Sequence, residues 1–137
     1  MHLVVDGNCE NTTIMVNKNL MTNFLRRLAG VADMHIVKEP MLCAYPWPES
    51  DNVDALSGFV FLAESSISIH CHPENRWIFL DVFSCKFMDV YKVEAYIVNS
   101  CRMTSGRLML IDRGIAGGQC VSGGVIMERD ILTGVKS

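Results

Sequence analysis

The sequence predicts an α+β fold, a two-layer α/β sandwich in which an antiparallel sheet carries two helices on one face. Two segments have apolar residues at helical spacing, and several others are short strand-like runs. The order of these segments is strand, helix, four strands, helix and strand, which fits two layers better than a parallel sheet. A chain of 137 residues, half of them apolar, can bury one core. The other face of such a sheet is available to a partner subunit.

The N-terminal third supplies the first strand and the first helix. Residues 2–5 form an apolar run, and Asp-Gly-Asn at 6–8 indicates a turn. Residues 15–29 predict an amphipathic helix that Gly30 closes, because apolar residues recur every four positions. These residues are Val16, Leu20, Phe24 and Leu28, with Leu25 beside them.

The later elements follow in close order. Residues 34–44 predict a strand that Pro40 limits or bends, and the proline-rich, polar segment 45–55 predicts a loop. Three strand-like runs, a helix and a last strand come next, over 57–63, 66–71, 77–83, 88–100 and 107–111. Residues 73–76 make the turn between the runs 66–71 and 77–83.

The remaining residues are rich in glycine and indicate either a hairpin, with residues 125–127 as one arm, or a mobile tail. We therefore divide the chain into a domain over residues 1–113 and a Gly-rich C-terminal extension over residues 114–137.

Composition excludes several classes of function. The net charge is −3 and the basic residues are scattered, so we expect no binding to nucleic acid. No apolar run approaches the roughly 20 residues of a membrane span, and no signal peptide is visible, so we expect no membrane association and a cytoplasmic location. The six cysteines contain no C-x-x-C pair and are expected to be free thiols.

Polar residues with chemical potential gather around the strands over 66–72 and 77–84. If these strands form a hairpin, opposite positions sum to about 149, so Ser65 faces residue 84 and lies beside Cys85. Ser68, His70 and His72 share one strand face because side chains alternate. Ser57 begins the preceding strand, which folds back along the same hairpin. We therefore expect one small region to hold a hydroxyl nucleophile, an imidazole and a thiol.

Taken singly, these residues also have ordinary structural explanations. A serine at a strand turn is commonly a turn residue, and a half-buried histidine is commonly structural. Cys71 is interpreted as a packing residue. His70 and His72 would offer a metal two ligands but no third, so we predict no metal site. The chain has no G-x-S-x-G motif, which argues against a serine hydrolase.

Several of these segments together resemble the signature of the prokaryotic S-adenosylmethionine decarboxylases. The similar segments are Ala-Glu-Ser-x-Ile-Ser-Ile-His at 63–70, Pro-Glu at 73–74, Leu-Asp-Val-Phe-Ser-Cys at 80–85, Ser-Gly at 57–58 and His-Leu-Val-Val-Asp at 2–6. The resemblance covers most of residues 2–113 and contains no gap over 57–85. It implies a homodimer of processed αβ protomers, with the sheets and active sites at or near the interface.

The resemblance also implies self-cleavage between Glu64 and Ser65. The serine hydroxyl attacks the preceding carbonyl, a base removes the Cα proton, and the chain after the cut begins with a ketone. His70 is the implied base and Ser57 assists. The product is a covalent pyruvoyl group derived from Ser65, and this group is the implied cofactor.

For turnover, the resemblance implies a Schiff base between the pyruvoyl carbonyl and the substrate amine, with the carbonyl as electron sink for decarboxylation. Cys85 is the implied proton donor, because a thiol is largely protonated at neutral pH. Glu74 is implied to accept hydrogen bonds from the substrate's ribose hydroxyls. The product would be the aminopropyl donor for spermidine, within polyamine biosynthesis.

Two departures from the signature concern the substrate. His72 stands where the family has an aromatic residue that stacks on adenine, and the other stacking element is replaced by a segment containing Tyr45 and Trp47, either of which offers an aromatic face. Decarboxylation of ornithine or arginine by the same machinery is therefore an alternative, and an unprocessed, non-enzymatic homologue is a second. We favour S-adenosylmethionine because Glu74 is retained.

Overall fold

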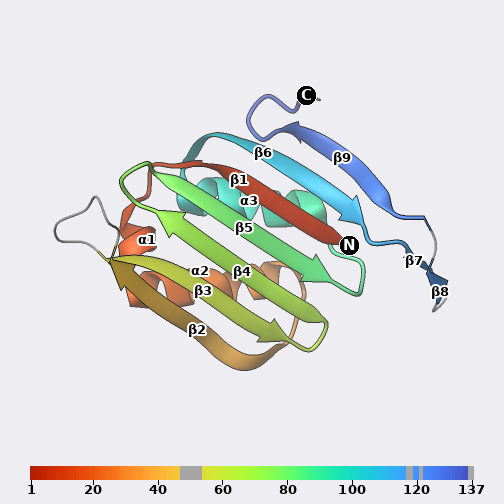
Figure 1. Ribbon diagram of the computed structural model, residues 1–137, viewed down its shortest axis with the longest axis horizontal. Helices are drawn as coiled ribbons and strands as arrows, with labels where there is room; N and C mark the ends of the chain where they lie inside the picture. Colours follow the sequence, from red (N-terminus) through yellow and green to blue (C-terminus); the bar gives the residue numbers. More distant parts are fainter. Residues whose placement is uncertain (47–53, 117–118, 121, 136–137) are drawn as a thin grey trace.

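The computed structural model describes residues 1–46, 54–116, 119–120 and 122–135. Within these residues, seven strands form one antiparallel sheet in the order β2-β3-β4-β5-β1-β6-β9 (Figure 1). The strands of this sheet are β1 (His2–Cys9), β2 (Ile36–Pro46), β3 (Asp54–Leu62), β4 (Ser65–His72), β5 (Trp77–Ser84), β6 (Met103–Asp112) and β9 (Gly124–Asp130). A separate pair joins β7 (Ile115–Ala116) to β8 (Gln119–Cys120).

The helices cover one face of the sheet, and in Figure 1 they lie behind it. They are α1 (Thr13–Val16), α2 (Lys18–Val31) and α3 (Val90–Cys101). The predicted two-layer α+β sandwich is confirmed, with the one-turn α1 as an additional element. Asn17 separates α1 from α2, and its side chain accepts a hydrogen bond from the Leu20 N–H at 3.0 Å.

The buried face of α2 differs from the predicted one. Leu20 is 43 % exposed, whereas Met21 is fully buried beside the predicted Phe24, Leu25 and Leu28. The helix starts afresh at Lys18, after the break at Asn17, so the apolar spacing cannot be continued from Val16. The helix also runs one residue past Gly30, which the sequence had suggested as its end.

The predicted turn at residues 6–8 is wrong, because β1 continues through them to Cys9. Gly7 lies directly opposite Gly106 of β6. A Cβ atom at Gly7 would lie 2.3 Å from the Ser105 carbonyl oxygen. The glycine therefore permits close approach of two strands instead of reversing the chain. As a result β1 spans the sheet between β5 and β6.

The predicted hairpin register is confirmed. Ser65 pairs with Ser84 and His72 pairs with Trp77, so opposite residues of β4 and β5 sum to 149. On the other side of β4, Ser57 of β3 pairs with His70. These pairings fix the relative positions of the candidate site residues.

The long strand β2 carries the irregularity expected near Pro40, because its register with β3 shifts between Lys38 and Met41. Tyr45 and Pro46 belong to β2 and Asp54 to β3, so the strands extend into the segment predicted as a loop. Trp47, predicted to bind substrate, lies outside the described residues.

Part of the C-terminal extension joins the sheet as β9, an edge strand paired with β6. The Arg129 guanidinium donates to the carboxylate of Glu94 on α3, and both side chains are largely buried. The division of the chain at residue 113 remains a prediction. Among the described residues, no helix has the length and apolar character needed to cross a membrane.

Candidate active site

The first group of candidate residues, Glu64, Ser65 and Cys85, is called the hairpin cluster below. It lies at one end of the β3–β4–β5 region. The Ser65 hydroxyl donates to the main-chain carbonyl oxygen of Glu64. The Cys85 N–H donates to the same oxygen at 3.1 Å. The peptide bond between residues 64 and 65 therefore has a hydroxyl nucleophile beside it and a backbone donor on its carbonyl, as an acyl shift requires.

Cys85 also borders a cavity of about 250 Å³. Its side chain is exposed, so the thiol is accessible from this side. The Arg113 guanidinium lies 4.3 Å from the centre of the Phe83 ring. The cavity is lined by Met1, Phe83, Ser84, Cys85, Asp112 and Arg113. A small molecule in this cavity would contact the thiol and a cation.

The second group, Tyr45, Ser57, His70 and His72, is called the histidine cluster. Ser57 Oγ lies 2.6 Å from His70 Nδ1. Tyr45 stacks on the His70 ring, with centroids 5.2 Å apart, and its hydroxyl lies 3.2 Å from His70 Nε2. His72 meets His70 edge-on at a centroid distance of 4.9 Å.

These contacts set the proton positions on His70. The Tyr45 hydroxyl donates its one proton to the Cys71 carbonyl oxygen at 2.5 Å, so toward His70 it acts as an acceptor. We infer that the proton of the neutral ring lies on Nε2, which leaves Nδ1 free to accept from Ser57. Burial, and secondarily the charge of His72, lowers the pKa of His70. The ring is therefore suited to act as a neutral base.

Glu74 lies in the turn between β4 and β5, close enough for its charge to act on Tyr45. Burial first, then Cys71 and Glu74, raises the pKa of the Tyr45 hydroxyl. Tyr45 is thus neutral, and its aromatic ring lies within electrostatic reach of the Glu74 carboxylate. Burial raises the pKa of Cys71 to about 12, which is consistent with its interpretation as a packing residue.

The structure does not bring the two clusters together within one chain, contrary to the prediction of one small region. Ser65 and His70 are five residues apart on the same strand. At roughly 3.3 Å per residue, about 16 Å separates them. Cys85 shares the Ser65 end, whereas Ser57 shares the His70 end.

Sequence patterns did not point to two further residues, His35 and Lys86, that contact the Glu64 carboxylate. His35 Nδ1 lies 2.6 Å from Glu64 Oε1, and Lys86 Nζ lies 3.6 Å from the same oxygen. His35 follows α2 and is 29 residues away in sequence. No motif links it to Glu64, and only the folded chain reveals the contact.

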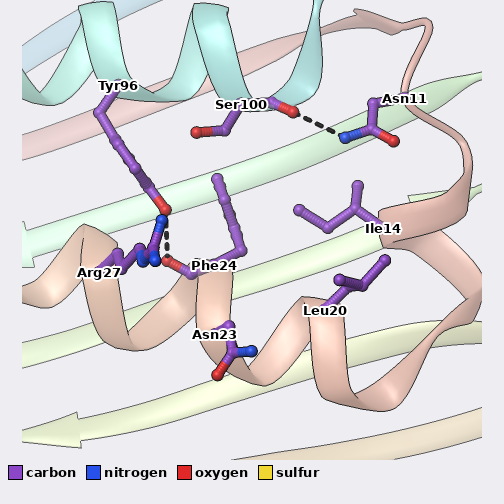
Figure 2. A pocket seen from close by; sticks show the side chains of 8 residues that line it. All are labelled: Asn11, Ile14, Leu20, Asn23, Phe24, Arg27, Tyr96 and Ser100. Atoms are coloured by element: carbon purple, nitrogen blue, oxygen red, sulfur yellow. Dashed lines mark hydrogen bonds between the residues drawn. The ribbon is translucent and has the colours of Figure 1, made fainter.

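A separate hollow of about 270 Å³ lies in the helical layer (Figure 2). Two of its polar side chains are hydrogen-bonded within it: Tyr96 donates to the Phe24 carbonyl oxygen at 3.2 Å, and the Asn11 amide donates to the Ser100 carbonyl oxygen at 2.9 Å. None of the candidate site residues lines it. Among the described residues, no group of three metal-binding side chains converges.

Comparison with known proteins identifies related sequences and folds. The family model described as S-adenosylmethionine decarboxylase matches residues 1–114. The S-adenosylmethionine decarboxylase proenzyme of Clostridium botulinum (strain Loch Maree) is 30 % identical over 114 residues, which cover 82 % of this chain and 92 % of the relative. The proenzyme of Hydrogenobaculum is 40 % identical over 65 residues, covering 47 % of this chain and 48 % of the relative.

A fold comparison agrees. The crystal structure of the adenosylmethionine decarboxylase from Aquifex aeolicus superposes with a TM-score of 0.67 at 20 % identity, covering 86 % of this chain and 92 % of that one. At this identity the match supports the fold.

Proposed function

The chain belongs to the S-adenosylmethionine decarboxylase family, and we propose that it cleaves itself between Glu64 and Ser65 and then decarboxylates S-adenosylmethionine to the aminopropyl donor for spermidine synthesis. Its family makes it a decarboxylase. The observation that carries the proposal is the Glu64 carbonyl oxygen, which accepts hydrogen bonds from both the Ser65 hydroxyl and the Cys85 N–H.

Self-cleavage begins when Ser65 Oγ attacks the carbonyl carbon of Glu64. The C–N bond breaks, an ester forms, and the nitrogen of Ser65 takes up a proton. The Cys85 N–H stabilises the negative charge on the carbonyl oxygen during this shift. A base then removes the Ser65 Cα proton, and Glu64 leaves as a carboxylate. Hydrolysis of the resulting imine releases ammonia and leaves a ketone at position 65.

His70 is the proposed base, which requires a second copy of the chain because of the separation of about 16 Å. We propose a homodimer in which the histidine cluster of one protomer meets the hairpin cluster of its partner. The sheet face opposite the helices supports this arrangement, because Phe61, Trp77 and Phe79 are exposed there as an aromatic surface. Closed two-fold pairing would then create two equivalent sites.

For turnover, the pyruvoyl group formed from Ser65 supplies a carbonyl that withdraws electrons from the substrate. Cys85 lies beside this position and would return a proton to the substrate carbon. Glu74 and Tyr45 would bind the nucleoside part, one through its carboxylate and the other through its aromatic face.

We also propose a cytoplasmic location. Cys9, Cys71 and Cys101 are buried free thiols, and a reducing compartment keeps such thiols unpaired.

Mass spectrometry of the purified protein tests self-cleavage. We expect two chains, residues 1–64 and 65–137, with a carbonyl at the start of the second that borohydride and an amine can trap. Release of CO₂ from S-adenosylmethionine, ornithine and arginine should then be compared side by side. A single intact chain without a trappable carbonyl would refute the processing mechanism, and release from ornithine or arginine alone would refute the substrate.

A further inference from the structure

We propose that His35 and Lys86 are positioning residues for self-cleavage, which hold the Glu64 side chain so that its main-chain carbonyl stays between Ser65 Oγ and the Cys85 N–H. This inference rests on the proposed cleavage between Glu64 and Ser65. His35 and Lys86 lie outside both clusters. They would act through Glu64, the residue before the bond that is cut.

His35 binds the Glu64 carboxylate twice. Its backbone N–H donates to Oε2 at 2.9 Å, and Nδ1 lies 2.6 Å from Oε1. A second backbone hydrogen bond joins the same two segments, because the Ala63 N–H donates to the His35 carbonyl oxygen at 2.9 Å. The turn that carries the scissile bond is therefore fastened to the segment between α2 and β2 by both main chain and side chain.

Lys86 approaches the same carboxylate from the segment that follows β5. Its Nζ lies 3.6 Å from Glu64 Oε1 and donates to Asp33 Oδ2 at 3.1 Å. Lys86 follows Cys85, whose N–H binds the Glu64 carbonyl. Two consecutive residues thus hold Glu64, one through its main chain and the other through its side chain.

The charges favour a permanently ionised Glu64. Hydrogen bonds from the His35 side chain and backbone lower the pKa of Glu64 to about 2. The hydrogen bond to Asp33, with a smaller contribution from Glu64, raises the pKa of Lys86. The carboxylate and the ammonium therefore keep their charges across the neutral range. The Glu64 side chain is only 17 % exposed, although His35 is 78 % exposed.

Restricting the Glu64 side chain restricts the bond that Ser65 attacks. An acyl shift needs the attacking oxygen close to the carbonyl carbon in a narrow geometry, and a displacement of about 1 Å can cost about 100-fold in rate. The contacts of His35 and Lys86 with the Glu64 carboxylate would act on the first step, formation of the ester. It would have no part in the later removal of the Cα proton.

The test uses the full-length chain and follows cleavage by denaturing gel after synthesis in a cell-free system. We expect His35→Ala and Lys86→Met each to slow cleavage by about tenfold and the double variant by about 100-fold. Lys86→Arg should recover most of the rate, since it restores the charge. Arg26→Ala is the matched control, because it removes a surface ion pair of α2 with β2, Arg26–Glu39 at 2.6 Å, away from the turn.

Hydroxylamine identifies the step that is affected, because it cleaves an ester but leaves a peptide bond intact. The slow variants should show no added cleavage with hydroxylamine, since the ester does not form. Wild-type rates in both single variants would overturn the inference, as would an ester that accumulates and is cleaved by hydroxylamine. Failure of the wild-type chain to split would instead refute the proposed self-cleavage. Circular dichroism confirms that the compared variants are folded.

Discussion

The hairpin cluster and the histidine cluster lie at opposite ends of β4, which contributes Ser65 to the first and His70 and His72 to the second, but they are built in different ways. In the hairpin cluster, the Glu64 carbonyl oxygen accepts from one backbone donor, the Cys85 N–H, and from the Ser65 hydroxyl, and the Glu64 side chain is fixed by residues distant in sequence. In the histidine cluster, contacts between side chains set the geometry around His70: a tyrosine stacks on an imidazole that faces a serine hydroxyl. The first region provides a bond to break, and the second provides a base.

This difference indicates that one chain contains both the bond to be cut and the base, but holds them apart. The Cys85 N–H survives side-chain changes, so cleavage should depend in the hairpin cluster on the Ser65 hydroxyl and, less strongly, on the contacts that hold the Glu64 side chain. The histidine cluster has no such support and should respond to each substitution. Substitutions in the two clusters test this division.

Ser65→Ala should abolish cleavage and leave no carbonyl, because the substitution removes the hydroxyl that is hydrogen-bonded to the Glu64 carbonyl oxygen. Mass spectrometry should show a single intact chain without decarboxylase activity. Ser66→Ala is the neighbouring control and should still split. Cleavage of the Ser65→Ala chain at the same bond would show that the nucleophile lies elsewhere.

Co-expression of Ser65→Ala with His70→Ala tests whether the clusters meet between chains. Neither variant should be active alone. In a mixed dimer, one of the two shared sites has both native residues, so random pairing should restore about one quarter of the wild-type activity. If the mixture is as inactive as the separate variants, each site is formed within one protomer and the proposed arrangement is wrong.

Cys85→Ala should separate cleavage from turnover. The backbone N–H at position 85 survives the substitution, so we expect at least partial cleavage. Without the thiol, correct protonation should fall by about 100-fold. Gel analysis measures the first effect, and the ratio of released CO₂ to correct product measures the second. Complete loss of cleavage would mean that the thiol itself serves the acyl shift.

His72→Gln should produce the smallest change, a shift in pH dependence. Burial is the main cause of the lowered pKa of His70 and the charge of His72 the second, so removing His72 should raise that pKa. Cleavage needs the neutral ring and is lost as pH falls through this pKa. The acid limb of the wild-type rate should therefore lie below about pH 6.5 and move upward in the variant.

The same lowered pKa links His70 to stability. Because the folded chain disfavours protonation of His70, it should lose stability as pH falls below about 6.5. Denaturant unfolding at several pH values should show a smaller loss for His72→Gln. An acid limb and a stability curve that do not move would show that His72 has no influence on the ring.

Local patterns in the sequence were sufficient for the fold class and for the register of β4 with β5. A polar turn between two alternating strands leaves only one pairing, which places Ser65 opposite Ser84. Gly7 was misread because a glycine that permits close strand contact has the same local signature as one in a turn. The helix face near Leu20 was misread because the break at Asn17 resets the periodicity.

The site itself was only partly predictable. Pairing along the hairpin correctly placed Ser65 opposite position 84, but the expectation of one small region took no account of the distance along β4 that separates Ser65 from His70. The contacts of His35 and Lys86 with Glu64 depend on where the segment after α2 returns to the sheet. Such long-range placement follows from packing of the whole domain and has no sequence motif.

The position of β1 has a consequence for the fate of a severed chain. A cut between Glu64 and Ser65 would assign β1, β2 and β3 to one fragment and β4, β5, β6 and β9 to the other. Since β1 is hydrogen-bonded on both sides, to β5 and to β6, a strand of the N-terminal fragment would lie between two strands of the C-terminal fragment. The two fragments would therefore stay associated in one sheet after the peptide bond between Glu64 and Ser65 is cut.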